Sequence, residues 1–304
     1  MNETTPPLVS IRCITYNHGK YIRDALEGFI MQKTNFKFEA IVHDDASTDN
    51  TAIIIQEYAK KYPDIIKPIF ETENQYSKHD GSLTRIMYAA CKGKYIAYCE
   101  GDDFWTDPYK LQKQVDFLEN HPDYVMCSHR YHSYNETKQI MLPIIRPINT
   151  NPPLTYSLND LIEGKWLFHP LTVMYRRQAF ILEDFLKYGM SYDVIRFYHL
   201  LKSGKGYLLP DIMATYRIHE NGIWSKLKQE EQFALELKQR VAIYNIEKNR
   251  LAADLIFNVI MNRPFSRKWL IKNRLFIKQI MIIIYKQKGL RTAFKVFHQL
   301  FIHI

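Results

Sequence analysis

The segment Glu100-Gly101-Asp102-Asp103 brings three carboxylates together within four residues, a spacing that favours cation chemistry. It follows the apolar run 95–99, where a β-strand is expected to end and the chain to turn. Carboxylates this close repel one another unless a cation lies between them, and Mg²⁺ is usually held by one or two carboxylates together with phosphate oxygens of a substrate. The cluster therefore predicts a divalent cation, Mn²⁺ or Mg²⁺, that binds a diphosphate. The alternative is a solvated acidic turn.

A second acidic pair, Asp44-Asp45, occupies the same kind of position earlier in the chain. It follows residues 38–43, which are typical of a buried strand, and precedes residues 53–62, whose apolar side chains recur at the spacing of one helix face. Strand, acidic turn and helix is the arrangement in which open α/β sheets bind ligands at the carboxyl ends of their strands. The repetition favours a ligand site over two unrelated solvated turns.

A third segment follows the same scheme with neutral polar residues in the turn. Residues 8–14 are a strand candidate, Thr15-Tyr16-Asn17 begin the turn, and residues 21–31 have the apolar spacing of a helix. Neither GxGxxG nor the phosphate-binding GxxxxGK[ST] pattern occurs here. A nucleotide at this edge of the sheet would therefore be held by side chains and a metal.

The three segments VSIRCITYNHGKYIRDAL, FEAIVHDDASTDNT and GKYIAYCEGDDFWTDPYKLQKQVDFLE, in this order, resemble the family 2 glycosyltransferases. The resemblance covers residues 7–222. It implies an α/β fold of the GT-A type, a three-layer α/β/α sandwich with a Rossmann-like nucleotide-binding half. It also implies that a nucleotide-sugar is the donor. We therefore expect residues 1–222 to form the glycosyltransferase domain.

The resemblance also carries residue roles. Nucleotide-sugar binding is implied for Thr15, Tyr16, Asn17, Asp44, Asp45 and Asp102, with Asp45 at the base and Asp102 at the ribose. Metal binding is implied for Asp103, Asp102, Glu100 and, from the Tyr-Arg-x-His signature at residues 216–219, His219. Glu100 departs from the Asp that the family usually has there. Arg85 stands where the family often has Asn.

Asp193 stands where the family has its catalytic Glu-Asp or Gly-Asp motif, with Tyr192 as a departure. The resemblance implies that Asp193 takes the proton of an acceptor hydroxyl while that oxygen attacks the anomeric carbon from the opposite face. A single displacement of this kind inverts the configuration. The structural alternative is an Asp that merely favours a helix start. No Ser-His-Asp nucleophile is apparent.

The function predicted from these residues is an inverting, metal-dependent glycosyltransferase. The donor is expected to be a UDP-sugar, because an Asp beside uracil can accept its imide N–H, and the acceptor a hydroxyl of a glycan or lipid-linked molecule in surface polysaccharide synthesis. A sugar nucleotidyltransferase is an alternative, but such enzymes usually carry a Gly-rich basic loop that Thr15–Lys20 does not match. A non-catalytic nucleotide- or glycan-binding module would not need Asp102, Asp103 and Asp193.

The net charge of +9 is concentrated in the C-terminal tail. No acidic residue follows Asp254, whereas residues 255–304 contain ten Lys or Arg. The longest unbroken apolar run there, Ile280–Tyr285, is far shorter than the roughly 20 residues of a membrane-spanning helix. We expect residues 223–304 to form a basic, amphipathic helical extension in which residues 263–302 lie on an anionic membrane surface. A helical cap on the domain or a homodimer contact is the alternative. Nucleic acid is not expected, because no recognised motif accompanies the charge.

The cysteines and the N-terminus bear on location. Cys13, Cys91, Cys99 and Cys127 show no CxxC spacing, so buried, reduced thiols are expected. The sequence MNETTPPL has neither the basic nor the apolar region of a signal peptide. These features predict a cytoplasmic protein, and the basic tail predicts a peripheral position on the inner face of the cell membrane.

Overall fold

The computed structural model describes residues 6–143, 154–190, 192–262 and 267–301. The contacts between residues divide the chain into two compact units. Unit 1 contains residues 1–156, 167–183 and 199–220, and unit 2 contains residues 157–166, 184–198 and 221–304. The predicted boundary at residue 222 stays a prediction.

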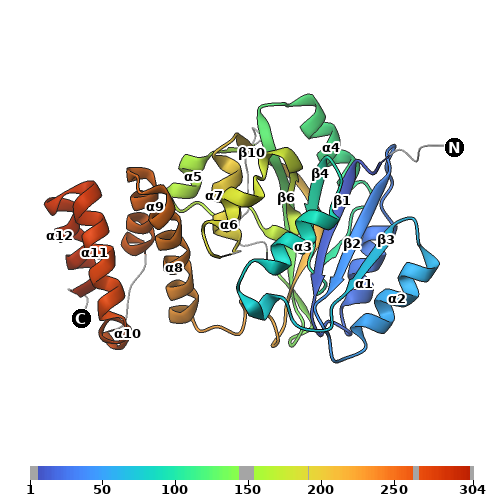
Figure 1. The fold of residues 1–304 in the computed structure, drawn as a ribbon, viewed down its shortest axis with the longest axis horizontal. Helices are drawn as coiled ribbons and strands as arrows, with labels where there is room; N and C mark the ends of the chain where they lie inside the picture. The colour runs from blue at the N-terminus through green and yellow to red at the C-terminus, as the bar shows by residue number, and fades with distance from the viewer. Residues whose placement is uncertain (1–5, 144–153, 191, 263–266, 302–304) are drawn as a thin grey trace. The chain divides into compact units, whose positions relative to one another are not determined.

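Unit 1 is built on a single mixed β-sheet (Figure 1). Along the sheet the strands follow the order β3-β2-β1-β4-β9-β6-β10-β5, with β7 paired to β6 and β8 to β10. Strands β1 to β4 pair in parallel, whereas β9 runs antiparallel to both of its neighbours. The bounds of the strands are Val9–Thr15 (β1), Phe38–Asp44 (β2), Ile66–Phe70 (β3), Tyr95–Tyr98 (β4), Phe104–Trp105 (β5), Tyr124–Asn135 (β6), Ile140–Leu142 (β7), Leu154–Tyr156 (β8), Met174–Arg176 (β9) and Lys205–Ile218 (β10).

Helices flank this sheet, and their apolar faces complete its core. On α1, Ile22, Leu26 and Phe29 are fully buried at the spacing of one helix face. They pack with residues of β1, β2 and β4, whose side chains are buried on both faces, as is usual for parallel strands. The helical elements of unit 1 are α1 (Ile22–Ile30), α2 (Thr51–Lys61), η1 (Tyr76–Lys78), α3 (Ser82–Ala90), α4 (Lys110–Asn120), η2 (Pro170–Thr172) and η3 (Arg177–Ala179).

The strands and helices expected around the polar turns are confirmed within a few residues. The strand candidates 8–14, 38–43 and 95–99 correspond to β1, β2 and β4, and the helix candidates 21–31 and 53–62 correspond to α1 and α2. The Rossmann-like half of the predicted sandwich is therefore present as the parallel sheet β3-β2-β1-β4 with its helices.

A buried polar network fixes the chain just after the acidic turn. The indole Nε1 of Trp105 donates to the carbonyl of Leu171 at 3.1 Å, and Lys110 Nζ lies 3.8 Å from the centroid of the Trp105 ring. Lys110 is fully buried and donates to Gln114 Oε1 at 2.7 Å. Burial lowers the pKa of Lys110 to about 7. Gln114 in turn donates to the carbonyl of Cys127 at 3.0 Å, which ties β5 and α4 to β6.

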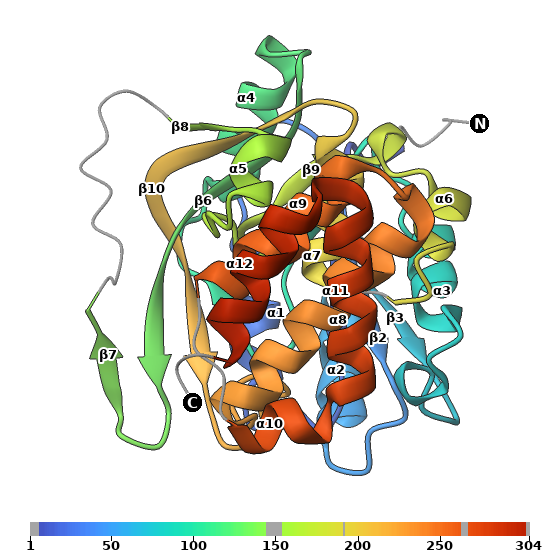
Figure 2. The ribbon, with the colours of Figure 1, turned by 90° about the vertical axis from the view of Figure 1, so that its left-hand side faces the viewer.

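Unit 2 is helical and has its own apolar core (Figure 2). Leu237, Ile256, Ile260, Ile280 and Val296 are buried together, so the C-terminal helices pack on one another. None of the described helices is both long and apolar enough to cross a membrane. The helices are α5 (Leu158–Ile162), α8 (Gln229–Glu247), α9 (Arg250–Met261), α10 (Arg267–Lys272), α11 (Arg274–Lys288) and α12 (Leu290–Phe301), while α6 (Leu182–Leu186) and α7 (Asp193–Leu201) each belong partly to both units.

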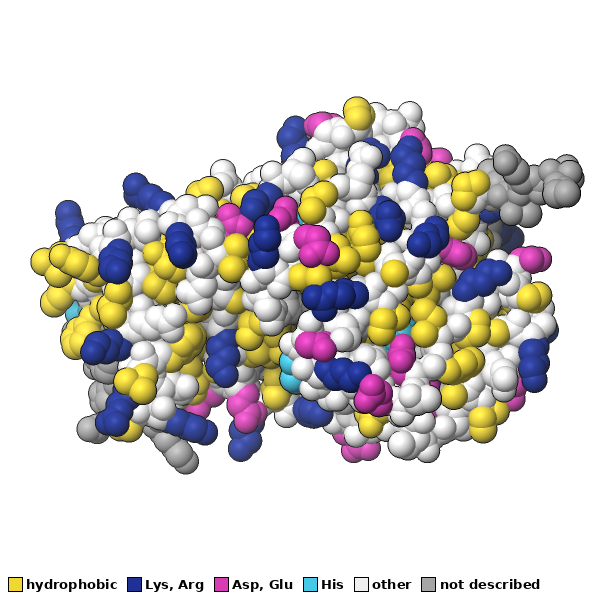
Figure 3. Space-filling view, viewed as in Figure 1, with side chains coloured by type: hydrophobic (Ala, Val, Ile, Leu, Met, Phe, Trp, Pro, Cys, Tyr) yellow, Lys and Arg dark blue, Asp and Glu magenta, His cyan; other side chains and the backbone are white. Residues whose placement is uncertain are grey.

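Over the C-terminal helices, Lys and Arg side chains alternate with hydrophobic ones at the surface (Figure 3). This agrees with the helical, basic C-terminal region predicted from the sequence. Residues 263–266 and 302 of the predicted membrane-binding segment lie outside the described residues.

Candidate active site

Asp102 lies in the turn between β4 and β5, where two imidazoles face its carboxylate. His219 Nε2 is 3.1 Å from Asp102 Oδ2, and His18 Nε2 is 3.6 Å from the same oxygen. Burial works against ionisation of Asp102, but the hydrogen bond from His219 and the nearby His18 outweigh it and lower its pKa. The Asp102 side chain keeps 22% of its surface exposed, so a charged carboxylate remains open to a ligand.

Asp103 has a different environment from Asp102, although the two are adjacent. It is only 4% exposed, and its Oδ1 accepts the backbone N–H of Arg217 at 2.8 Å. Burial and the charge of Asp102 raise its pKa well above the usual range. The Arg217 guanidinium donates to the carbonyl of Asp102 at 3.0 Å and to Asp24 Oδ2 at 2.6 Å. Asp103 and Arg217 thus fasten the acidic turn to the end of β10.

Glu100 has a different type of partner from Asp102 and Asp103, namely a guanidinium. The neighbouring Gly101 lets the turn pack closely against the end of β1. Glu100 Oε1 lies 3.4 Å from Arg12 Nη1 in an ion pair. A Cβ atom at Gly101 would lie 2.7 Å from Thr15 Cβ and 3.0 Å from His18 Nδ1, closer than real side chains allow. The Gly101 N–H also donates to the carbonyl of Ile14 at 3.0 Å. Only glycine lets this turn approach the end of β1 so closely.

The turn after β1 carries the three predicted nucleoside contacts. Thr15 is buried, and its Oγ1 has no hydrogen-bond partner among the described residues, whereas Tyr16 is 45% exposed. Asn17 has a left-handed backbone, with φ at 56°. Its Oδ1 accepts the N–H of Thr48 at 2.8 Å, and its own N–H donates to Ser47 Oγ at 2.9 Å. Asn17 thereby locks the turn after β1 to the turn after β2.

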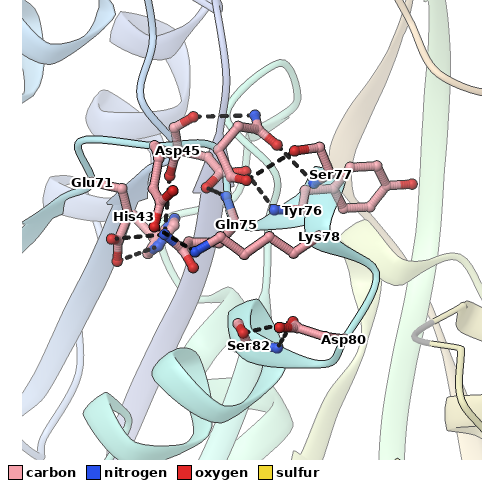
Figure 4. A network of polar contacts seen from close by, with 11 residues as sticks. His43, Asp45, Glu71, Gln75, Tyr76, Ser77, Lys78, Asp80 and Ser82 are labelled. Carbon is pink, nitrogen blue, oxygen red and sulfur yellow. Dashed lines mark hydrogen bonds and ion pairs between the residues drawn. The ribbon is translucent and has the colours of Figure 1, made fainter.

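Asp45 uses its carboxylate to hold the segment that contains η1 (Figure 4). It is 1% exposed; its Oδ1 accepts the N–H of Gln75 at 2.7 Å and its Oδ2 accepts the N–H of Tyr76 at 3.0 Å. Asp44 differs, because its Oδ2 accepts the N–H of Ser47 at 3.1 Å while its buried Oδ1 has no partner in the described part of the chain. Both oxygens of Asp45 are thus already occupied.

Side-chain contacts complete this network. Glu71 lies 3.3 Å from His43 Nε2 through one oxygen and 3.3 Å from Gln75 Nε2 through the other. Lys78 Nζ pairs with Glu73 Oε1 at 2.6 Å. The segment from Glu71 to Lys78 is therefore held at Glu71 by His43 of β2. The Asp45 carboxylate holds it again at Gln75 and Tyr76.

Asp193 is the first residue of α7. Its side chain is 44% exposed, and Oδ1 lies 3.2 Å from Nη1 of the buried Arg196. The Arg196 guanidinium and the start of the helix both present positive electrostatic potential to this carboxylate. Its catalytic role stays a prediction.

The four predicted metal ligands are not gathered into one set. Asp102 and His219 are in contact, whereas Asp103 faces the backbone of Arg217 and Glu100 faces Arg12. Within the described ranges, no three His, Cys, Asp or Glu side chains are arranged to hold a metal ion. Sequence reasoning also missed His18 and Gly101, although a glycine between acidic residues is a recognisable sign of close backbone approach.

The fold and the acidic turn define a GT-A-type protein, and solved structures share this architecture. S. aureus TarS, solved in complex with UDP-GlcNAc, superimposes with a TM-score of 0.64, covering 91% of this chain and 80% of the TarS chain at 18% identity. At that identity the likeness concerns the fold. The three-layer, Rossmann-like GT-A architecture predicted from the sequence is thus confirmed.

Sequence comparison then gives the family. The model of glycosyl transferase family 2 matches residues 10–182, so the chain belongs to the family 2 glycosyltransferases. An uncharacterised protein of Mycobacterium tuberculosis is 38% identical over 218 residues, which are 71% of this chain but 60% of that relative's length. The putative teichuronic acid biosynthesis glycosyltransferase TuaG of Bacillus subtilis is 29% identical over 224 residues, 72% of this chain and 82% of TuaG.

Proposed function

We propose that the protein transfers a sugar, with inversion, from a UDP-sugar to a hydroxyl of a glycan or lipid-linked acceptor in surface polysaccharide synthesis. The observation that carries this proposal is the open, charged Asp102 carboxylate beside His219, at the edge of the sheet where the polar turns after β1 and β2 also lie. Family membership supports glycosyl transfer. The UDP-GlcNAc complex of TarS supports the donor class, and the pathway named for TuaG supports the product class.

A divalent cation, Mn²⁺ or Mg²⁺, fits the residues of this turn. Asp102 and His219 offer a carboxylate oxygen and an imidazole nitrogen 3.1 Å apart, and such a cation commonly completes its shell with phosphate oxygens and water. We assign the cation to Asp102 and His219 rather than to Glu100 or Asp103, because those two carboxylates have other partners. When bound, the cation would neutralise charge on the departing nucleoside diphosphate.

The nucleoside is assigned to the turns after β1 and β2. Thr15 Oγ1 and Asp44 Oδ1 are buried acceptors without partners among the described residues, and an unsatisfied buried polar atom costs free energy that a ligand or water can recover. Tyr16 offers an exposed ring for the base. Asp45 shapes this pocket indirectly by fixing Gln75 and Tyr76.

Asp193 is proposed as the general base. The acceptor O–H bond breaks as its proton passes to the Asp193 carboxylate, while the oxygen forms a bond to the anomeric carbon. The bond from that carbon to the diphosphate oxygen breaks in the same displacement, and the nucleoside diphosphate leaves with the electron pair. No covalent enzyme intermediate is required, so the product has the inverted configuration.

A ligand screen tests the proposed function. The full chain is heated with UDP-, GDP- and other nucleotide-sugars, with and without Mn²⁺, and nucleoside diphosphate release is then measured. A bound donor should raise Tm, because it stabilises the folded chain by RT ln(1 + [L]/Kd). Pyrophosphate release from a nucleoside triphosphate and a sugar phosphate would favour the nucleotidyltransferase, and binding without any turnover would favour the binding module. Absence of both binding and turnover would contradict the proposal.

We also propose a cytoplasmic location, peripheral on the inner face of the membrane, with attachment through residues 263–302. The exposed basic and apolar side chains of that segment support it. A homodimer contact through the same segment is the competing proposal.

A further inference from the structure

Helix α12 presents three parallel stripes of side chains, each with the i, i+3 or i+4 spacing of one helix face. One stripe is buried in the core of unit 2: Ala293, Val296 and Leu300. A second stripe is apolar yet exposed: Leu290 (73%), Phe294 (65%) and Phe297 (47%). The third is basic and exposed: Arg291, Lys295 and His298. Packing inside unit 2 explains the first stripe and leaves the other two facing outward.

Helix α11 repeats the arrangement. Its inward face is buried through Ile277, Ile280 and Ile284. Its outward face exposes apolar and basic side chains together: Leu275 (77%), Lys278, Ile282 (45%), Tyr285 (56%) and Lys286. We call these outward residues of α11, together with the apolar and basic stripes of α12, the α11–α12 face. Figure 3 shows such side chains gathered over the C-terminal helices.

The α11–α12 face has no acidic residues, because none follows Asp254 in the sequence. Among the described residues, Lys288 pairs with Asp254, while Lys278, Lys286, Arg291 and Lys295 form no ion pair. At the edge of the face there is a surface hollow lined by Met261, Phe294, Lys295, His298 and Gln299. Apolar side chains beside the Lys295 ammonium suit an acyl chain near an anionic headgroup.

Charge decides between two occupants of this face. In a two-fold dimer this face, which has no acidic residues, would meet a second copy of itself, so basic side chains would approach basic side chains and repel. An anionic lipid surface instead offers phosphates to the basic stripe and an acyl region to Leu290 and Phe294. Amphipathic helices that lie in the plane of a membrane interface have this composition.

We propose that the α11–α12 face docks on an anionic lipid bilayer, with its exposed apolar stripe inserted among the acyl chains and its basic residues at the lipid phosphates. This deepens the proposed peripheral location of the enzyme, on which it rests, by naming the surface that makes the contact.

The test uses the full chain and vesicles of phosphatidylcholine, alone or mixed with phosphatidylglycerol. Wild type should co-sediment with the mixed vesicles and not with phosphatidylcholine alone, and added salt should weaken binding. Arg291→Gln with Lys295→Gln should lower the partition coefficient roughly fivefold for each charge removed. Phe294→Ser with Phe297→Ser should also lower it. The matched controls lie on α2. Ile53→Ser removes an exposed apolar side chain and Lys60→Gln an exposed positive charge, and both variants should bind as wild type.

Three further measurements separate the outcomes. Circular dichroism melting shows that each variant is folded, and calorimetry with a UDP-sugar shows that its donor site is intact. Vesicle binding without donor binding in wild type would contradict the proposed function and leave the docking face standing. Donor binding without vesicle binding at low salt would overturn the docking face alone. A dimer in light scattering that Phe294→Ser with Phe297→Ser converts to monomer, with no change in vesicle binding, would assign the face to a second copy and also overturn the proposal.

Discussion

The two acidic pairs of this protein follow the same sequence pattern and have different surroundings. Asp44-Asp45 ends β2 and Asp102-Asp103 follows β4, the two strands that flank β1. In the first pair, Asp45 is saturated by two backbone N–H groups of a segment 30 residues away. In the second pair, Asp102 is shared by two imidazoles. The type of partner, rather than the presence of carboxylates, separates a residue that holds a loop from one that is open to a cation.

Exposure agrees with this division. Asp45 is 1% exposed, and backbone N–H groups already occupy both of its carboxylate oxygens. The Asp102 side chain is 22% exposed. The imidazoles of His18 and His219 can move away from it when a cation binds, or bind that cation together with it. We therefore expect changes at the first pair to affect folding of the nucleoside pocket, and changes at the second to affect metal-dependent binding.

The largest expected effect concerns a carboxylate outside both pairs. Asp193→Asn removes the proposed proton acceptor but neither a donor contact nor a metal ligand, so turnover should fall roughly 10²–10⁴-fold with donor affinity unchanged. Steady-state kinetics and calorimetry measure the two quantities. Asp184→Asn is the control, because Asp184 is a similarly exposed Asp paired with Lys187 at 2.6 Å. If donor affinity and turnover fall together, Asp193 is structural.

The next effect tests whether Asp102 is the open member of its pair. Asp102→Asn keeps the shape but removes the charge, so Mn²⁺-dependent affinity for UDP should fall at least as far as the roughly 10–100-fold seen when a supporting residue of a metal site is lost. EDTA should bring wild type down to the level of the variant and leave the variant unchanged. Equal UDP affinity of wild type with Mn²⁺ and with EDTA would show that UDP binding needs no cation at Asp102.

The third prediction concerns Asp45, whose two carboxylate oxygens are already occupied by backbone N–H groups. Asp45→Ala leaves the N–H groups of Gln75 and Tyr76 without acceptors, and the buried N–H of Gln75 alone should cost about 1–3 kcal/mol. Urea unfolding should show a loss of that order, and amide exchange at these two residues should accelerate. Asp44→Ala, which loses a single N–H bond from Ser47, should cost less. Unchanged exchange at Gln75 in Asp45→Ala would show that the segment is held by other contacts.

The sequence could predict the strands and the turns for a physical reason. Strands such as β1 and β2 are buried on both faces, so their largely apolar sequences stand out from the polar turns that follow them. The same reasoning placed Asp45 and Asp102 at one edge of the sheet. It expected both carboxylates to contact the donor complex directly, Asp45 at the base and Asp102 at the ribose and the metal.

Their partners could not be predicted in the same way. Gln75 and Tyr76 reach Asp45 through backbone N–H groups, which every residue except proline carries, so no side-chain pattern marks them. The contact of Arg217 with Asp103 crosses 114 residues and likewise uses a backbone N–H. Local sequence shows where a polar turn follows a strand. The long-range contacts that decide the roles of the polar residues depend on tertiary structure.

The smallest expected effect separates the two neighbours in the second pair. Asp103→Asn retains an oxygen that can accept the N–H of Arg217, so the turn should stay fastened to β10 and Mn²⁺-dependent UDP affinity should change by less than about fivefold, roughly 1 kcal/mol. Asp103→Leu removes the acceptor and should destabilise the fold by about 1–3 kcal/mol, because a buried N–H is left unpaired. Calorimetry and urea unfolding of both variants measure these effects. The sequence predicted Asp103 as a metal ligand, and in that case Asp103→Asn should lose as much affinity as Asp102→Asn. That result would make the second pair a joint cation site, and the contrast with Asp44-Asp45 would then lie between whole pairs rather than between single carboxylates.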